Sequence, residues 1–230
     1  MNIELENLTK KYDGKTILDN LSVIFPENKI SVVMGKSGIG KSTLLKCIAG
    51  LTTYSGAIKG AENVACVFQE DRLIPFMSVN ENLDFTIDKT VGKTDRRQKI
   101  SKVLQDVGLT EKSGALPDEL SGGQKKRVSL ARAFLSDAPV VLLDEPMNSL
   151  DFGLRIKTVE LFLNMLIQSP KTVIYVTHDI DEGLKIADNI FILDEHGISY
   201  KYVFSNSSQG RDILSGECAE VKRKLIEFLV

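Results

Sequence analysis

A glycine-rich segment at residues 35–43 has the residue types and the spacing of a phosphate-binding loop. It fits the pattern GxxxxGK(S/T) at every fixed position and runs through Gly35, Lys36, Ser37, Gly38, Ile39, Gly40, Lys41, Ser42 and Thr43. Glycines let successive backbone N–H groups turn toward one anion, and a helix that begins there adds partial positive charge. We expect Lys41 to reach the β- and γ-phosphates, and Ser42 to ligate Mg²⁺ through its hydroxyl. The alternative is a glycine-rich turn that only joins a strand to a helix. The match and its context favour binding of a nucleoside triphosphate.

Two carboxylates supply the second chemical element. Val140–Leu143 predicts a buried strand that delivers Asp144 and Glu145 at its carboxyl end, beside the phosphate loop. We expect Asp144 to hold Mg²⁺, and Glu145 to polarise the water that attacks the γ-phosphate. An acidic helix cap after a core strand is the alternative, and the phosphate loop argues against it.

The elements that must position these groups begin with strands. Apolar and polar residues alternate over residues 3–5 and 21–25, which is the period of a half-exposed antiparallel strand. Asp13-Gly14 stands between these runs as a turn signal. Ile30–Met34 is apolar at nearly every position, as expected of a strand buried on both faces.

Further buried strands alternate with helical patterns along the rest of the chain. A helix is predicted directly after the phosphate loop, with its end at Gly50. Residues 71–138 show helical spacing without a convincing buried strand, which predicts a helical subdomain inserted in an α/β body. The further buried strands are predicted at residues 64–68, 140–143 and 173–176. A hairpin and an amphipathic helix are predicted for residues 190–230. We therefore predict one domain over residues 1–230, of the α/β class, with a mainly parallel sheet and an N-terminal antiparallel β subdomain.

Composition excludes several classes of protein. Hydrophobic residues make up 43% of the chain, which is enough for a core and excludes intrinsic disorder. The 29 Lys and Arg against 31 Asp and Glu give a net charge of −2, which argues against a dedicated nucleic-acid binder. No apolar run approaches the roughly 18–20 residues that cross a bilayer, and no secretory signal opens the chain. With three widely spaced cysteines, the sequence predicts a cytoplasmic protein without a disulfide framework.

A third element separates this chain from other phosphate-loop enzymes, such as small-molecule kinases. The segment Leu120–Gln124, here called the signature segment, reads LSGGQ and is followed by Ala131-Arg132-Ala133. Ser121 can cap a helix whose first residues, Gly122 and Gly123, expose N–H donors, which makes a second anion site. One chain then carries two anion sites but one phosphate loop. If two chains faced each other head-to-tail, the second anion site of each would close over the phosphate loop of the other. Gln124 completes the segment, which resembles the signature of the ATP-binding-cassette (ABC) family.

The resemblance covers about residues 2–193 and implies an ATPase of the phosphate-loop (P-loop) NTPase fold that uses ATP and Mg²⁺. It implies that Tyr12 stacks on adenine and that Gln69 reaches Mg²⁺ and the attacking water. Ser149-Leu150-Asp151 resembles the loop that crosses the dimer interface, so Asp151 is expected at the nucleotide. His178 resembles the histidine that contacts the γ-phosphate. The bland alternatives are a strand-end aromatic at Tyr12 and a structural histidine at His178.

Lys126 departs from the family pattern. Many relatives carry glutamine at this position after the signature segment. We expect little effect from the change, because Arg127 is retained.

The resemblance extends to a group within the family. Residues 146–151 are similar to the short form common among bacterial importers, and residues 69–76 resemble the ATPases of nitrate, sulfonate and taurine importers. This implies a homodimer, or a pair with a similar ATPase subunit, on the inner face of the cell membrane. Its partners would be integral membrane permease subunits and, indirectly, an external solute-binding protein, with no nucleic acid. An exporter ATPase, a soluble ABC protein outside transport and a phosphotransfer kinase remain open alternatives.

Overall fold

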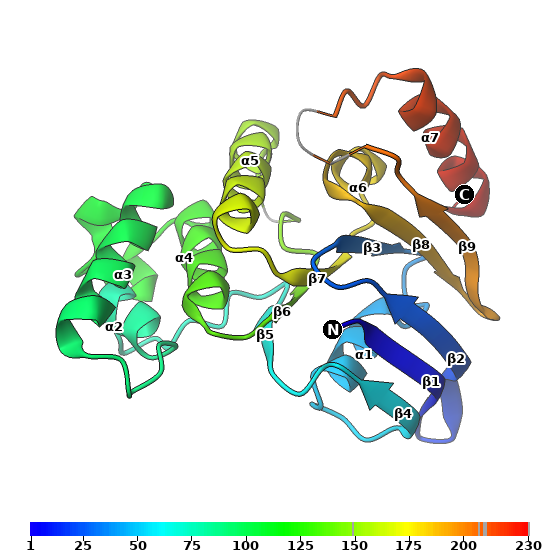
Figure 1. Cartoon of the computed structure of the whole chain (residues 1–230), viewed down its shortest axis with the longest axis horizontal. Coiled ribbons are helices and arrows are strands. Elements are labelled where there is room, and N and C mark those ends of the chain that lie inside the picture. Colours follow the sequence, from blue (N-terminus) through cyan, green and yellow to red (C-terminus); the bar gives the residue numbers. More distant parts are fainter. Residues whose placement is uncertain (149, 207, 209–210, 230) are drawn as a thin grey trace. The chain divides into compact units, whose positions relative to one another are not determined.

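The computed structural model describes residues 1–148, 150–206, 208 and 211–229. The chain divides into two compact units (Figure 1). The first comprises Met1–Val64, Val140–Glu145 and Lys171–Val230, and the second comprises Ala65–Pro139 and Pro146–Pro170. The second unit thus takes in residues 65–70 and 146–170 besides the predicted helical segment at 71–138.

The first unit contains a three-stranded antiparallel sheet at the N-terminus. Its strands are β1 (Ile3–Tyr12), β2 (Lys15–Phe25) and β4 (Ser55–Lys59), in the order β2-β1-β4. Tyr12 pairs with Lys15, so the loop between β1 and β2 has two residues. Asp13 and Gly14 both have positive φ, 47° and 81°, as a tight hairpin turn requires. The alternation of residues and the Asp-Gly pair therefore predicted this hairpin correctly.

The first unit also contains a mainly parallel sheet in the order β6-β7-β3-β8-β9 (Figure 1). Its strands are β3 (Ile30–Met34), β6 (Val140–Asp144), β7 (Thr172–Val176), β8 (Asn189–Asp194) and β9 (Gly197–Val203). Every residue of β3, β6 and β7 is buried, as their continuous apolar runs predicted. Only β9 is antiparallel to its neighbour. The helices of this unit are α1 (Lys41–Ile48), α6 (Ile180–Ile186) and α7 (Gly216–Leu229).

The second unit is mostly helical. Its helices are α2 (Val79–Asp84), α3 (Lys93–Asp106), α4 (Gly122–Leu135) and α5 (Phe152–Gln168), with short 3₁₀ turns at Thr110–Lys112 and Pro117–Glu119. Apolar side chains from all four helices share one core, which includes Leu83, Leu104, Val128 and Met165. Strand β5 (Val64–Val67) begins at the last residue of the first unit's opening segment, and only its Val67 is fully buried. The predicted fold class is confirmed. Over the described ranges, no helix has both the length and the apolar character that crossing a bilayer needs.

Candidate nucleotide-binding site

The parallel sheet positions the chemistry of the first unit. Val176 of β7 is in register with Val33 of β3 and with Asp144 of β6. The carboxyl ends of these three neighbouring strands therefore lie side by side. The phosphate loop follows β3, Glu145 follows β6, and His178 comes two residues after β7, which places all three at the edge of the sheet where α/β proteins bind ligands.

The phosphate loop closes around the ammonium group of Lys41. Gly38 and Gly40 have φ of 77° and 114°, and Gly40 is the N-cap of α1. Lys41 is the first residue of α1 and is buried, and its Nζ donates hydrogen bonds to the carbonyl oxygens of Gly35 (2.7 Å) and Lys36 (3.0 Å). Burial lowers the pKa of Lys41, and the nearby carboxylates of Glu145 and Asp144 partly oppose this. The cation is thus held inside the loop, where an anion can replace the two carbonyls as its partner.

Ser42 and Asp144 form a pair of oxygen donors next to this loop. The Ser42 hydroxyl donates a hydrogen bond to Asp144 Oδ1 over 3.0 Å. Burial raises the pKa of Asp144, while the hydrogen bond from Ser42 acts in the opposite direction. Ser42 is exposed although Asp144 is buried. Hydroxyl and carboxylate oxygens are the ligands that Mg²⁺ prefers, and it normally takes only one or two from the protein beside those of a phosphate. These residues therefore fit a Mg²⁺ site.

Glu145 has an unusual backbone conformation. Its φ is 44°, in the left-handed region that side chains other than glycine rarely adopt, at a cost of roughly 1–3 kcal/mol. The Glu145 N–H donates a hydrogen bond to the Val176 carbonyl over 2.9 Å, which anchors the strained residue to β7. Its Oε1 lies 3.3 Å from Nδ1 of His178. The Glu145 side chain is 20% exposed and that of His178 is 58% exposed, so both can meet a ligand.

Tyr12 ends β1 and is 42% exposed. The ammonium group of Lys10 lies 4.4 Å from the centre of its ring and also donates a hydrogen bond to the Thr53 carbonyl. An exposed aromatic face at this strand end is compatible with stacking on a base.

The signature segment and Asp151 belong to the second unit, where each forms a helix cap. The Ser121 hydroxyl accepts a hydrogen bond from the Gln124 N–H (3.3 Å), and the Gln124 side chain accepts one from the Ser121 N–H (2.9 Å). Ser121 thus caps α4, as predicted, and Gln124 completes a capping box. Gly122 and Gly123 are the first residues of α4, where backbone N–H groups have no acceptor within the helix. The Asp151 carboxylate accepts a hydrogen bond from the Leu154 N–H and caps α5 (2.9 Å). Ser149 lies outside the described residues.

Gln69 also belongs to the second unit, and the residue that holds it was not predicted. The Gln69 side chain is exposed, but the backbone carbonyl oxygen of Gln69 accepts a hydrogen bond from Nζ of Lys126 over 3.1 Å. Lys126 is completely buried. A signal was available in the sequence, because Lys126 falls on the helical face shared by Gly123, Leu130 and Ala133, which are all buried.

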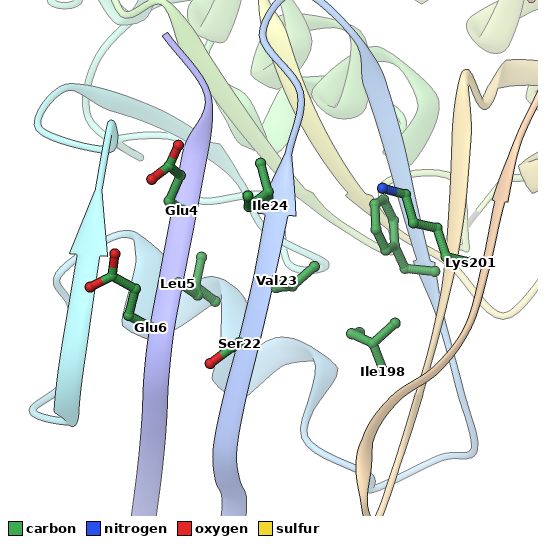
Figure 2. Close-up of a pocket in the computed structure, with 9 residues that line it drawn as sticks. Glu4, Leu5, Glu6, Ser22, Val23, Ile24, Ile198 and Lys201 are labelled. Carbon is green, nitrogen blue, oxygen red and sulfur yellow. The ribbon is translucent and has the colours of Figure 1, made fainter.

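The first unit contains a separate cavity of about 560 Å³ beside β1, β2 and β9 (Figure 2). Glu4 and Ile24 line one side and Ile198 the other, and the ammonium group of Lys201 lies 5.4 Å from the ring centre of Phe191. None of the predicted site residues lines this cavity. The groups at the carboxyl ends of β3, β6 and β7 therefore form the candidate site, and this cavity does not. These groups identify the class of the protein as a phosphate-loop nucleotide-binding protein.

Comparisons with known proteins agree with this class. The family model described as ABC transporter matches residues 18–148. Aliphatic sulfonates import ATP-binding proteins of Rhodococcus jostii (strain RHA1) and Streptomyces avermitilis are 36% and 34% identical to this chain. Their alignments cover 86% and 99% of this chain, and 81% and 86% of the relatives. MJ0796, a bacterial ABC transporter cassette solved as a dimer, matches with a TM-score of 0.77 at 28% identity, over 89% of this chain and 99% of that one.

The chain therefore belongs to the ABC transporter family. It is an ATP-binding cassette that hydrolyses ATP for transport.

Replacing Lys41 by alanine is expected to weaken ATP binding about 10- to 100-fold. The substitution removes a charged donor whose hydrogen bonds are worth roughly 1.5–3 kcal/mol. Calorimetric titration with ATP measures the change. Lys102→Ala is the matched control, because Lys102 is an exposed lysine on helix α3 of the second unit and should leave the affinity within about twofold. Unchanged affinity in Lys41→Ala would mean that residues 35–43 do not bind the triphosphate.

Proposed function

We propose that this chain is the ATPase subunit of an importer for a small solute of the nitrate, sulfonate and taurine group. Two copies close head-to-tail on two Mg·ATP and drive a pair of integral membrane permease subunits from the cytoplasmic face. The observation that carries the proposal is the meeting of Lys41, the Ser42–Asp144 pair and the Glu145–His178 pair at the carboxyl ends of β3, β6 and β7.

Binding of ATP starts at the phosphate loop. The backbone N–H groups of residues 35–43 surround the phosphates, and Lys41 exchanges its carbonyl partners for the β- and γ-phosphate oxygens. Tyr12 stacks on the adenine. Ser42 and Asp144, with Gln69, would hold Mg²⁺, which would neutralise charge on the phosphate oxygens.

Hydrolysis then depends on Glu145 and His178. The Glu145 carboxylate accepts a hydrogen bond from the attacking water and turns its oxygen toward the γ-phosphorus. The new P–O bond forms as the bond to the bridging oxygen of ADP breaks, and inorganic phosphate is released. His178 contacts the γ-phosphate and keeps Glu145 oriented through the 3.3 Å contact between Nδ1 and Oε1. The strained backbone of Glu145 and its hydrogen bond to Val176 pre-organise the carboxylate.

The signature segment supplies the second half of each site. Its helix N-terminus presents the N–H groups of Gly122 and Gly123 to the γ-phosphate bound by the other copy, with Ser121 and Gln124 shaping the turn. Asp151 lies on the segment that meets the partner. The dimeric state of MJ0796 supports pairing of two copies, and the names of the curated relatives support import of a sulfonate-like solute. An external solute-binding protein is the indirect partner that an importer of this kind would need.

Affinity capture tests the transport part of the proposal. A tagged Glu145→Gln chain is purified with Mg·ATP from solubilised membranes of the source cells, beside a tagged Lys41→Ala chain as control. We expect a protein with several membrane-spanning helices to be recovered with Glu145→Gln. A solute-binding protein should be recovered in the same sample or be encoded beside the gene of that membrane protein. The same complex assembled with the unsubstituted chain, which hydrolyses ATP, should then accumulate the solute in the lumen of liposomes with ATP inside, whereas an exporter would expel it.

The other outcomes lead to the alternatives. Recovery of ribosomes, of DNA or of no membrane protein would keep the ATPase activity and contradict the transport role. Release of free phosphate from ATP without an acceptor excludes a phosphotransfer kinase.

A further inference from the structure

The segment between β5 and α2, residues 68–78, forms neither helix nor strand. Its backbone carbonyls therefore need partners from outside regular structure. Three side chains of the second unit supply them. Lys126 binds the start of the segment, Arg132 donates a hydrogen bond to the Arg72 carbonyl (2.7 Å), and Asn82 donates hydrogen bonds to the carbonyls of Ile74, Met77 and Ser78.

Lys126 makes the contacts nearest to Gln69. Its Nζ donates hydrogen bonds to the carbonyl oxygens of Phe68 (3.2 Å) and Gln69 (3.1 Å), and it lies 3.0 Å from Oδ1 of Asp71. Two of these three oxygens accept hydrogen bonds from the ammonium group, and Oδ1 of Asp71 makes an ion pair with it without a hydrogen bond. The contacts fall immediately before Gln69, on it and two residues after it. The backbone around Gln69 is thus held on both sides, while the Gln69 side chain stays exposed.

We propose that Lys126 is a positioning residue for Gln69 in ATP hydrolysis. It fixes the backbone of residues 68–71 to α4, the helix that begins at the signature segment, so that Gln69 and Ser121 move as one body. The inference rests on the role given to Gln69 in the proposed function, and it adds a residue that acts through Gln69.

Burial explains why this contact serves placement better than stability. Taking an ammonium and a carboxylate out of water costs several kcal/mol per ion, so a buried pair contributes little net stability over an apolar side chain. Lys126 is completely buried and Asp71 is 14% exposed. What the pair provides is geometry, because a charged group with three fixed oxygen partners allows few alternative arrangements of the backbone.

Asp71 balances the charge that Lys126 brings. A neutral glutamine at position 126 can donate hydrogen bonds to the two carbonyls without requiring a carboxylate. With lysine there, the Asp71 carboxylate neutralises the cation in the interior. The departure from the family pattern at Lys126 is therefore matched by a second residue of the same contact.

The test measures kcat and KM for ATP and the melting temperature in four chains: unsubstituted, Lys126→Met, Gln69→Ala and the double variant. Methionine keeps the length and volume of the lysine stem and removes its hydrogen bonds. We expect Lys126→Met to lower kcat about tenfold, because small displacements of catalytic groups have effects of this size, with KM within about twofold. In the Gln69→Ala background the same substitution should leave kcat unchanged while still lowering the melting temperature.

Arg127→Met is the matched control. Arg127 is the next residue of α4 and donates a hydrogen bond to the Val107 carbonyl over 2.7 Å, away from Gln69. A similar loss of kcat in Arg127→Met would mean that both substitutions act by destabilising the fold, and this would overturn the inference. So would losses of kcat that multiply independently in the double variant, since a residue acting through Gln69 cannot act when Gln69 is absent.

Two further outcomes separate this inference from the proposed function. If Gln69→Ala lowers kcat and Lys126→Met does not, only the positioning role is wrong. If Gln69→Ala leaves kcat unchanged, the role of Gln69 is wrong and the inference fails with it. Should Lys126→Met not fold, Lys126→Gln replaces it, with an expected loss of about threefold in kcat that again disappears in the Gln69→Ala background.

Discussion

Glu145→Gln is expected to lower kcat for ATP hydrolysis by about 10²- to 10⁴-fold, the range that a positioned acid–base group contributes. The amide has nearly the shape of the carboxylate, so ATP affinity should stay within about threefold. The neutral oxygen cannot polarise the attacking water, which leaves ATP bound and the two copies closed on it. Phosphate release gives kcat, and light scattering with Mg·ATP gives the fraction of dimer.

Glu195→Gln is the matched control for this prediction. Glu195 is also a carboxylate beside a histidine, with its Oε1 3.5 Å from Nε2 of His196, but its side chain is 80% exposed and it lies after β8. The control should hydrolyse ATP like the unsubstituted chain. A Glu145→Gln chain that stays monomeric with saturating Mg·ATP would contradict closure of two copies on the nucleotide in the absence of membrane subunits.

The strand ends of the site could be predicted because their determinants are local. Continuous apolar runs identified β3, β6 and β7 as buried parallel strands, and parallel strands bring their carboxyl ends to one edge. Residues that follow such runs, such as Asp144 and His178, are therefore predictable as neighbours. The capping box at Ser121 was predictable for the same reason, since it involves residues three apart on one chain segment.

Other features depend on contacts between distant segments and escaped prediction. Strand β4 (Ser55–Lys59) has no apolar run, and its pairing with β1 defines it as a strand. Strand β5 reads as fully buried from its sequence, yet Val64, Ala65 and Cys66 are only half-buried. A one-dimensional pattern carries no information on which face of a strand another element covers.

The polar contacts of the site show the same limit. The sequence predicts that Lys41 meets phosphates, but not that the carbonyls of Gly35 and Lys36 hold it beforehand. It likewise does not predict the left-handed backbone of Glu145, which depends on an anchor at Val176 some 30 residues away. These contacts place the catalytic groups before ATP binds. They join segments that are distant in the sequence, so a local sequence pattern does not predict them.

Ser121→Arg is expected to reduce hydrolysis at least about 100-fold while ATP affinity stays within about threefold. The arginine fills the space before the N-terminus of α4 and blocks its N–H groups, whose contribution resembles that of oxyanion-hole donors. The ATP of each chain is held by its own Lys41 and Ser42, so binding should survive. Phosphate release and calorimetric titration measure the two effects.

Ser78→Arg is the matched control, because Ser78 caps α2 with the same kind of capping box, to Glu81. Both substitutions remove a cap worth roughly 1 kcal/mol and add a positive charge, but only Ser121 belongs to the signature segment. Ser78→Arg should therefore hydrolyse ATP at nearly the unsubstituted rate. If Ser121→Arg lost ATP affinity by as large a factor as it lost hydrolysis, the result would argue against sites shared between chains.

Mixing the two inactive variants tests the sharing directly. When Ser121→Arg and Glu145→Gln chains are combined in equal amounts before ATP is added, a mixed dimer has one site with both substitutions and one site with neither. Hydrolysis should recover to as much as about a quarter of the unsubstituted rate, because half of randomly formed dimers are mixed and one of two sites in each is intact. A chain that used its own signature segment could not recover in this way. Activity that stays at the level of the separate variants at every mixing ratio would contradict the head-to-tail arrangement.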